Sequence, residues 1–299
     1  MPLTGGSREA RGFATRFAPS PNGRLHLGHV RSALFAARTA RRIGGRFILR
    51  IEDIDITRSR TEFVSAIFDD LAWLGLTWEE PVLRQSEHFP DYIAAADRLR
   101  AMGVLYRCFA SRSEIAAAHD GRSFDPDGAP IYPGLHRGMS DDEQARRIDV
   151  GEMCAWRIDM EKALEIVQAK LSRAPLTYRA MDERGALSVV AMRPEVWGDA
   201  VIVRKEFPAS YHLAVVVDDA RQGVTHVTRG MDLEPATALH RLLQVLLDLP
   251  EPIYCHHGLV MGPDGRKLSK SDGAESVAAL RARGASAEEV RWAADNIGS

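Results

Sequence analysis

Two short motifs, far apart in the chain, carry side chains suited to phosphate chemistry. His26 and His29 flank Gly28 near the start, and Lys267 and Lys270 lie close together near the end. When a carboxylate attacks the α-phosphate of ATP, negative charge develops on the phosphoryl oxygens and the departing pyrophosphate, so donors must already be in place. The pair predicts one ATP site, built from two distant segments, that activates a carboxylic acid as its adenylate.

The histidine motif is predicted to lie where a loop becomes a helix. A turn-forming cluster at 19–23 precedes it, and apolar residues at helical spacing follow from Leu34 to Ile43. A helix N-terminus attracts anions, spacing i, i+3 places both histidines on one face, and Gly28 lets an adenine ring approach the backbone. We therefore expect ATP to contact Pro19, Ser20, Gly28, His29 and Lys270.

The lysine motif, Lys267-Leu268-Ser269-Lys270-Ser271, follows a flexible Gly-Pro-Asp-Gly turn at 262–265. The chain has only five lysines, and two of them lie in this loop. Each motif has an alternative interpretation: an H-x-x-H turn can bind a metal, and a basic loop is usually solvated surface. Their occurrence together, in this order, favours the adenylate-forming site, with His26, His29, Lys267 and Lys270 as the catalytic groups.

Composition limits the class of protein. The chain has 299 residues, of which 45% are hydrophobic and 27% charged, as expected for a globular protein of one large or two smaller domains. It has no apolar run of about 18 residues and no signal-peptide pattern, so we expect a cytoplasmic protein without a membrane partner. Three widely spaced cysteines predict free thiols. A net charge of −2 gives no hint of a nucleic-acid partner.

Alternating strands and helices predict an α/β fold with a Rossmann-type, doubly wound parallel sheet. Strand 15–18, helix 30–42 and strand 46–51 form a βαβ unit. The continuous apolar run 211–217, which ends at Asp218 and Asp219, predicts a buried central strand, and 225–229 predicts the next one. Further helices are expected at 61–74, 90–102 and 237–247, with a last one opened by the capping box of Ser286 and Glu289.

Loop-rich sequence interrupts this pattern in the middle of the chain. We expect residues 1–105 to form the first half of the catalytic domain and 205–299 the second half, with a short helical tail. Residues 106–204 are expected to form an inserted α+β connective subdomain.

Several segments resemble the catalytic half of the glutamyl-tRNA synthetases, which are class I enzymes. They are residues 16–29, 49–55, 214–219, 225–230 and the KLSKS loop at 267–271. The chain is most similar to a shorter branch that lacks the anticodon-binding domain and transfers glutamate to queuosine at the wobble position of tRNA(Asp). That similarity rests on three features, which are the early end after KLSKS, the Glu-Asp-Ile-Asp string at 52–55 and the Met-Asp-Leu string at 231–233.

The resemblance implies L-glutamate, ATP with Mg²⁺, and a tRNA as substrates. It also implies that the inserted subdomain 106–204 binds the acceptor end of the tRNA. Glutamate has two carboxylates and one ammonium, so its pocket needs a fixed cation and an anion, for which Arg16 and Glu52 are suited. By resemblance the pocket consists of Arg16, Phe17, Ala18, Pro19, Ser20, Glu52, Tyr211 and Arg229. The alternative for Glu52, Asp53 and Asp55 is a metal-binding carboxylate cluster.

The inserted segment departs from the family pattern. Related proteins often hold zinc with Cys-x-Cys and Tyr-x-x-x-Cys, whereas this chain has Cys108-Phe109-Ala110 and Tyr132 followed by His136. Cys108, Tyr132 and His136 would need His119 or a water as fourth ligand. We expect no bound zinc. Lys205-Glu206-Phe207 is a second departure, where the family commonly has an acidic residue and then glycine; it would change the rim of the pocket.

Three alternatives stay open at this point. The chain could be a minimal glutamyl-tRNA synthetase that charges the 3′ end of tRNA(Glu), a small-acid adenylyltransferase without an RNA partner, or a catalytically silent tRNA-binding protein. We expect a monomer.

Overall fold

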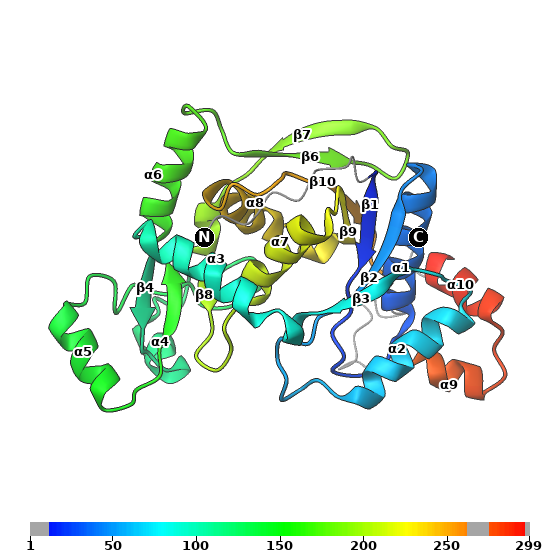
Figure 1. Cartoon of the computed structure of the whole chain (residues 1–299), viewed down its shortest axis with the longest axis horizontal. Helices are drawn as coiled ribbons and strands as arrows, with labels where there is room; N and C mark the ends of the chain where they lie inside the picture. Colours follow the sequence, from blue (N-terminus) through cyan, green and yellow to red (C-terminus); the bar gives the residue numbers. More distant parts are fainter. Residues whose placement is uncertain (1–11, 262–274, 297–299) are drawn as a thin grey trace.

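The computed structural model describes residues 12–261 and 275–296. Its centre is a seven-stranded sheet of order β3-β2-β1-β9-β10-β6-β7 (Figure 1). Neighbouring strands run parallel except β6 and β7. The prediction of a parallel α/β sheet is thus confirmed. The strands are β1 Ala14–Phe17, β2 Arg46–Ile51, β3 Glu79–Arg84, β6 Thr177–Met181, β7 Leu187–Ala191, β9 His226–Gly230 and β10 Ile253–His257.

The strand order creates a crevice at the carboxyl ends of β1 and β9. The chain winds from β1 outward through β2 to β3, whereas β9 and β10 lie on the other side of β1. The connections leaving β1 and β9 therefore diverge, and ligands of doubly wound sheets bind at such a switch point. Helix α1 (Leu27–Arg42) begins beside this crevice and packs along β1, β2 and β9.

Helices of the first and last parts of the chain lie around the seven-stranded sheet (Figure 1). Those expected at 61–74, 90–102 and 237–247 are present as α2, α3 and α8, and Ser286 opens α10 through reciprocal bonds with Glu289. They are α2 Thr61–Trp73, α3 Phe89–Ala101, α7 Tyr211–Gln222, α8 Ala236–Leu246, α9 Val277–Ala282 and α10 Ala287–Asn296, with short 3₁₀ turns η1 Gln85–Glu87, η2 Pro194–Trp197 and η3 Met231–Leu233. In the part of the chain that the structure describes, no helix combines the length and apolar character needed to cross a bilayer.

The prediction of a buried strand at 211–217 is wrong, because this segment forms the first half of α7. Ser210 caps the helix by accepting from the Leu213 N–H, and Gly223 ends it with a positive φ of 66°. The helix is apolar on several sides because it packs against both α3 and α8. A short continuous apolar run does not distinguish a buried strand from a buried helix.

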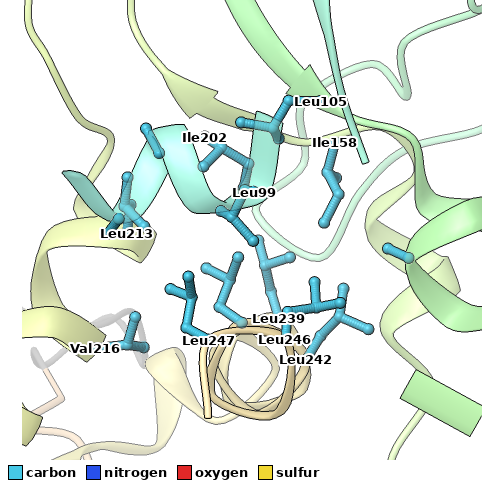
Figure 2. Close-up of a cluster of buried hydrophobic side chains, with 14 of the residues drawn as sticks. Leu99, Leu105, Ile158, Ile202, Leu213, Val216, Leu239, Leu242, Leu246 and Leu247 are labelled. Carbon is cyan, nitrogen blue, oxygen red and sulfur yellow. The ribbon is translucent and has the colours of Figure 1, made fainter. Parts of the chain in front are cut away.

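Helix α8 is the centre of the larger hydrophobic core (Figure 2). Leu239, Leu242 and Leu246 of α8 are fully buried. They pack in one cluster with residues from α3, α7 and the small second sheet, among them Leu99, Leu105, Ile158, Ile202, Leu213 and Val216. The core therefore joins the crevice-bearing sheet to the inserted segment.

The middle of the chain forms a separate three-stranded antiparallel sheet of order β4-β5-β8. The strands of this sheet and the helices between them are β4 Leu105–Cys108, α4 Arg112–Ala118, α5 Asp141–Asp149, β5 Ala155–Ile158, α6 Met160–Lys170 and β8 Val201–Val203. Strands β6 and β7, from the same stretch, instead extend the edge of the main sheet. We propose that the small sheet and its helices are the body of the subdomain expected at 106–204.

Replacing Leu239 by alanine tests the packing of α8. The substitution leaves a cavity in a fully buried layer, so we expect the free energy of unfolding in urea to fall by about 2–5 kcal/mol. Leu187→Ala on the exposed strand β7, where the leucine is 62% exposed, is the matched control and should change it by less than about 0.5 kcal/mol. Equal effects of the two substitutions would contradict the placement of α8 in the core.

Candidate active site

A cavity of about 610 Å³ opens at the carboxyl ends of β1 and β9. Its volume lies within the range of small-molecule sites. It brings together all the residues expected to bind ATP or glutamate that the structure describes, although they come from four separate segments. The residues that line it include Arg16, Phe17, Ala18, Pro19, Ser20, His26, Gly28, His29, Glu52, Tyr211 and Arg229.

His26 and His29 form the N-terminus of α1. The Nδ1 atom of His26 accepts from the Gly28 N–H at 3.1 Å, and the Nδ1 atom of His29 accepts from the His26 N–H at 3.1 Å. The two rings therefore cap the helix reciprocally, with centroids 3.9 Å apart. A Cβ atom on Gly28 would lie 3.0 Å from Cε1 of the His26 ring, so the capping ring would have to shift by a few tenths of an ångström to make room for it.

The capping bonds fix which ring nitrogens carry protons. A neutral imidazole whose Nδ1 accepts a hydrogen bond carries its proton on Nε2. Both rings line the cavity, and the first turn of α1 contains no acidic residue. The partial positive charge of the helix terminus is therefore not offset there, which is the arrangement of an anion site.

The lysine motif lies outside the described residues, and so do Lys267 and Lys270. The chain on either side of 262–274 can be placed. Before the gap, Leu259 and Val260 line the cavity. After it, Ser276 forms a β-bridge with His26, and the Val277 N–H donates to the Leu25 carbonyl at 2.8 Å.

A buried charge network forms the wall of the cavity beside Arg16. The Nε of Arg16 lies 3.0 Å from Oδ1 of Asp219, and its Nη1 donates to the Thr228 carbonyl at 2.9 Å. Arg50, whose side chain is fully buried, bonds the same Asp219 oxygen through Nη1 at 2.8 Å. Its Nη2 lies 3.3 Å from Oε1 of Glu52. Arg16 and Glu52 are thus held in place from behind.

The pKa values in this network follow from burial and charge. Burial by itself raises the pKa of Asp219, but Arg16 and Arg50 outweigh it, so the net pKa is lowered. Burial raises the pKa of Asp218, which accepts from Gln85 and Tyr92. Burial also raises the pKa of Glu52 against the opposing effect of Arg50. Among the described residues Glu52 is in contact with Arg50 at 3.3 Å, and it lines the cavity, as a receptor for an ammonium group would.

Arg229 lies on another wall of the cavity, in a different electrostatic setting. Its guanidinium contacts Thr237, His240 and His256 and lies over the Tyr254 ring, 5.3 Å from the centroid. Burial and then the charge of Arg229 lower the pKa of His256 to about 3 and the pKa of His240 well below its usual value. These partners are neutral. Among residues 12–261 and 275–296, Arg229 has no carboxylate partner within ion-pair distance.

Sequence analysis missed the residues that hold the pocket from behind. The position of Arg50 could have indicated its role, because it is a charged residue between the apolar residues of β2 that directly precede Glu52. The spacing of Thr237 and His240 was a weaker indication, since they stand three residues apart on the same helix, α8. The metal alternative for residues 52–55 is not favoured, because Asp53 bonds Arg84 and Ser86, and Asp55 bonds Thr57.

The residues of the degenerate zinc motif lie together, and protein groups already contact several of the atoms that would bind zinc. His136 Nδ1 accepts from the backbone N–H groups of Phe109 and Ala110. The Tyr132 hydroxyl accepts from the His136 N–H at 2.9 Å. A guanidinium from Arg157 lies 3.4 Å from the Cys108 sulfur and 4.0 Å from the centre of the Tyr132 ring. A tetrahedral zinc site needs four converging donors, which these contacts do not fit.

Comparison with known proteins agrees with this geometry. Residues 13–290 match the family described as "tRNA synthetases class I (E and Q), catalytic domain". The chain belongs to this family. The match includes β1, α1, the charge network and both segments flanking 262–274, so family membership covers every wall of the cavity described above.

Individual relatives fall into two groups by length. The chain is 44% identical to the glutamyl-Q tRNA(Asp) synthetase of Rhodobacter capsulatus, over 93% of this chain and 98% of that protein. It is 37% identical to the glutamate–tRNA ligase of Prochlorococcus marinus MIT 9303, but spans only 56% of that protein. A crystal structure of the glutamate–tRNA synthetase of Elizabethkingia anophelis superimposes with a TM-score of 0.69 at 29% identity, covering 88% of this chain and 53% of the other.

Replacing Arg50 by methionine tests the charge network. Three carboxylates would then share one remaining arginine, so we expect the free energy of unfolding at pH 7 to fall by about 3–5 kcal/mol. The carboxylates of the folded variant should have pKa values above those of the unfolded chain, so lowering the pH should stabilise the variant. The difference in free energy of unfolding between the variant and wild type should therefore become smaller as the pH falls from about 7.5 to about 5.5.

The control is Arg193→Met, which removes an exposed ion pair with Glu195. It should leave stability unchanged at either pH. An Arg50→Met deficit that stays constant with pH would mean that the arginine stabilises the fold by packing and not by charge.

Proposed function

We propose that the chain activates L-glutamate with ATP and transfers the glutamyl group to the queuosine base of tRNA(Asp). One observation carries the glutamate assignment: the cavity presents an anion, Glu52, and on a different wall a cation, Arg229, that has no carboxylate partner among the described residues. A ligand with an ammonium and two carboxylates complements this arrangement. Arg16, although paired with Asp219, adds a second guanidinium for the other carboxylate.

The proposed reaction takes place at the junction of this pocket with the N-terminus of α1. The α-carboxylate of glutamate attacks the α-phosphate of ATP in line and expels pyrophosphate. The Nε2 protons of His26 and His29 and the helix terminus stabilise the charge that develops on the phosphoryl oxygens. Lys267 and Lys270 are proposed to act on the pyrophosphate. The queuosine hydroxyl then attacks the acyl carbon and releases AMP, and no protein nucleophile is required.

ATP would bring Mg²⁺ on its phosphates, which neutralises charge on the pyrophosphate. The carboxylates nearest the glutamate pocket support this assignment, because Asp53 and Asp219 are engaged with arginines and are not grouped as metal ligands. The Pro19-Ser20 turn and Gly28 are proposed to receive the nucleotide.

The choice of acceptor is supported by the comparisons and not by the cavity. The Rhodobacter capsulatus relative, named for tRNA(Asp), aligns over nearly its whole length. A second relative with the same name, from Symbiobacterium thermophilum, is 40% identical over 92% of this chain. The glutamate–tRNA ligases match at lower identity and over about half their length. Charging of tRNA(Glu) is therefore the second candidate.

Transfer of labelled glutamate to two tRNA pools tests the proposal. One pool contains queuosine, and the other comes from cells that cannot make it. We expect ATP-dependent label on tRNA(Asp) of the first pool alone, with a bond stable to removal of the 3′-terminal adenosine. Label on tRNA(Glu) in both pools, lost with that adenosine, would make the protein a glutamate–tRNA ligase.

Two substitutions of His26 separate its structural and catalytic roles. Asparagine is a good N-cap but lacks the Nε2 proton, so His26→Asn should keep stability while lowering glutamate-dependent ATP–pyrophosphate exchange by about 10²-fold or more. His26→Ala should lose a comparable factor and also about 1 kcal/mol of stability. Exchange at the wild-type rate in His26→Asn would show that the ring serves only as a cap.

A further inference from the structure

We propose that His240 is a positioning residue that orients Arg229 toward the substrate carboxylate through a hydrogen-bond relay with a fixed direction. The inference rests on the proposed binding of glutamate at Arg229. His240 itself does not line the cavity. It lies on α8, fully packed behind Arg229, and acts only through that side chain.

The direction of the relay follows from the donors available. Arginine has only donors, so Nη1 of Arg229 must donate to Nδ1 of His240, at 3.0 Å. A neutral His240 then carries its proton on Nε2 and donates it to Nδ1 of His212, at 3.1 Å. His212 must in turn carry its proton on Nε2. One chain of bonds therefore runs from Arg229 to His212, and it exists only if both rings are neutral.

The surroundings keep both rings neutral. Burial, followed by the charge of Arg229, lowers the pKa of His212 to about 4 and the pKa of His240 well below its usual value. The ring of His212 also packs edge-to-face against Trp197, with centroids 5.3 Å apart. Protonation of either ring would place a second cation beside Arg229 and break the relay.

The relay decides which N–H groups of Arg229 remain for a ligand. Nε donates to His256 Nε2 at 3.3 Å, Nη2 donates to Thr237 Oγ1 at 2.7 Å, and Nη1 donates to His240. Within residues 12–261 and 275–296 these bonds use three of the five N–H groups, which leaves one on Nη1 and one on Nη2. Two adjacent N–H groups of a guanidinium match a carboxylate in bidentate geometry.

The nature of the partners matters as much as their number. A carboxylate behind Arg229 would hold the side chain equally well, but it would neutralise the charge that the substrate needs. Neutral acceptors orient the guanidinium and leave its charge for the ligand. We therefore expect the loss of the His240 acceptor to weaken glutamate binding while ATP binding, at the N-terminus of α1, stays the same.

Substitutions at His240 test the relay through ATP–pyrophosphate exchange. His240→Leu keeps apolar bulk but removes the acceptor, and should raise KM for glutamate about tenfold or more, with KM for ATP within about twofold of wild type. His240→Gln restores an acceptor for Arg229 and a donor for His212. It should return KM for glutamate to within about threefold of wild type.

A second variant and a control distinguish loss of the relay from loss of folding. His212→Phe keeps the aromatic packing on Trp197 but leaves the His240 Nε2 proton without its acceptor, so it should raise KM for glutamate by a smaller factor than His240→Leu. Leu239→Ala destabilises the same helix without touching Arg229. It should leave both KM values unchanged.

The tautomers provide a readout that does not depend on activity. Long-range ¹H–¹⁵N spectra of the histidine rings should show His240 and His212 as neutral rings protonated on Nε2. A His240 ring protonated on Nδ1, or a wild-type KM for glutamate in a folded His240→Leu or His212→Phe variant, would overturn the inference. Absence of glutamate-dependent exchange by the wild-type protein, with the expected tautomers present, would instead overturn the proposed function.

Discussion

The buried guanidinium of Arg50 is the constraint that places the other parts of the site. A fully buried cation near the end of β2 must find anions, because desolvation alone would make the folded state unfavourable. Asp218 and Asp219 of α7 supply them, together with Glu52 of the same strand region. Helix α7 is thereby fixed against the crevice, which brings Tyr211 to the cavity and gives Arg16 its partner.

The two walls of the cavity differ in charge and are held in place by different kinds of side chain. Around Arg16, three carboxylates and two arginines form a network whose residual charge, when all are ionised, is negative. Around Arg229, hydroxyl and imidazole acceptors supply hydrogen bonds without charge. In a weakly polarisable interior such charges are poorly screened, so the pocket presents separate negative and positive ends to a ligand. A free amino acid with an acidic side chain has the same polarity.

The spacing of residues predicted the parts of the site whose partners are close in the chain, and the family resemblance supplied the distant pocket residues. Both missed the residues that hold the pocket from behind. The cap formed by His26 and His29 is local, so the turn at 19–23 and the following helical spacing were sufficient to locate it. Arg50 and Asp219 are 169 positions apart, and nothing in the spacing of either segment pairs them. The failure at 211–217 has another cause: α7 is buried on several sides, which removes the polar face that normally identifies a helix.

His26 connects the histidine motif with the part of the chain that follows the lysine motif. The same residue caps α1, lines the cavity and pairs with Ser276, just after the described chain resumes at 275. Before residues 262–274, Leu259 and Val260 line the same cavity. The residues on both sides of the lysine motif therefore lie at or beside the site, although they are distant from His26 in the sequence. This placement of the flanking residues supports the proposal that the two motifs act on one ATP.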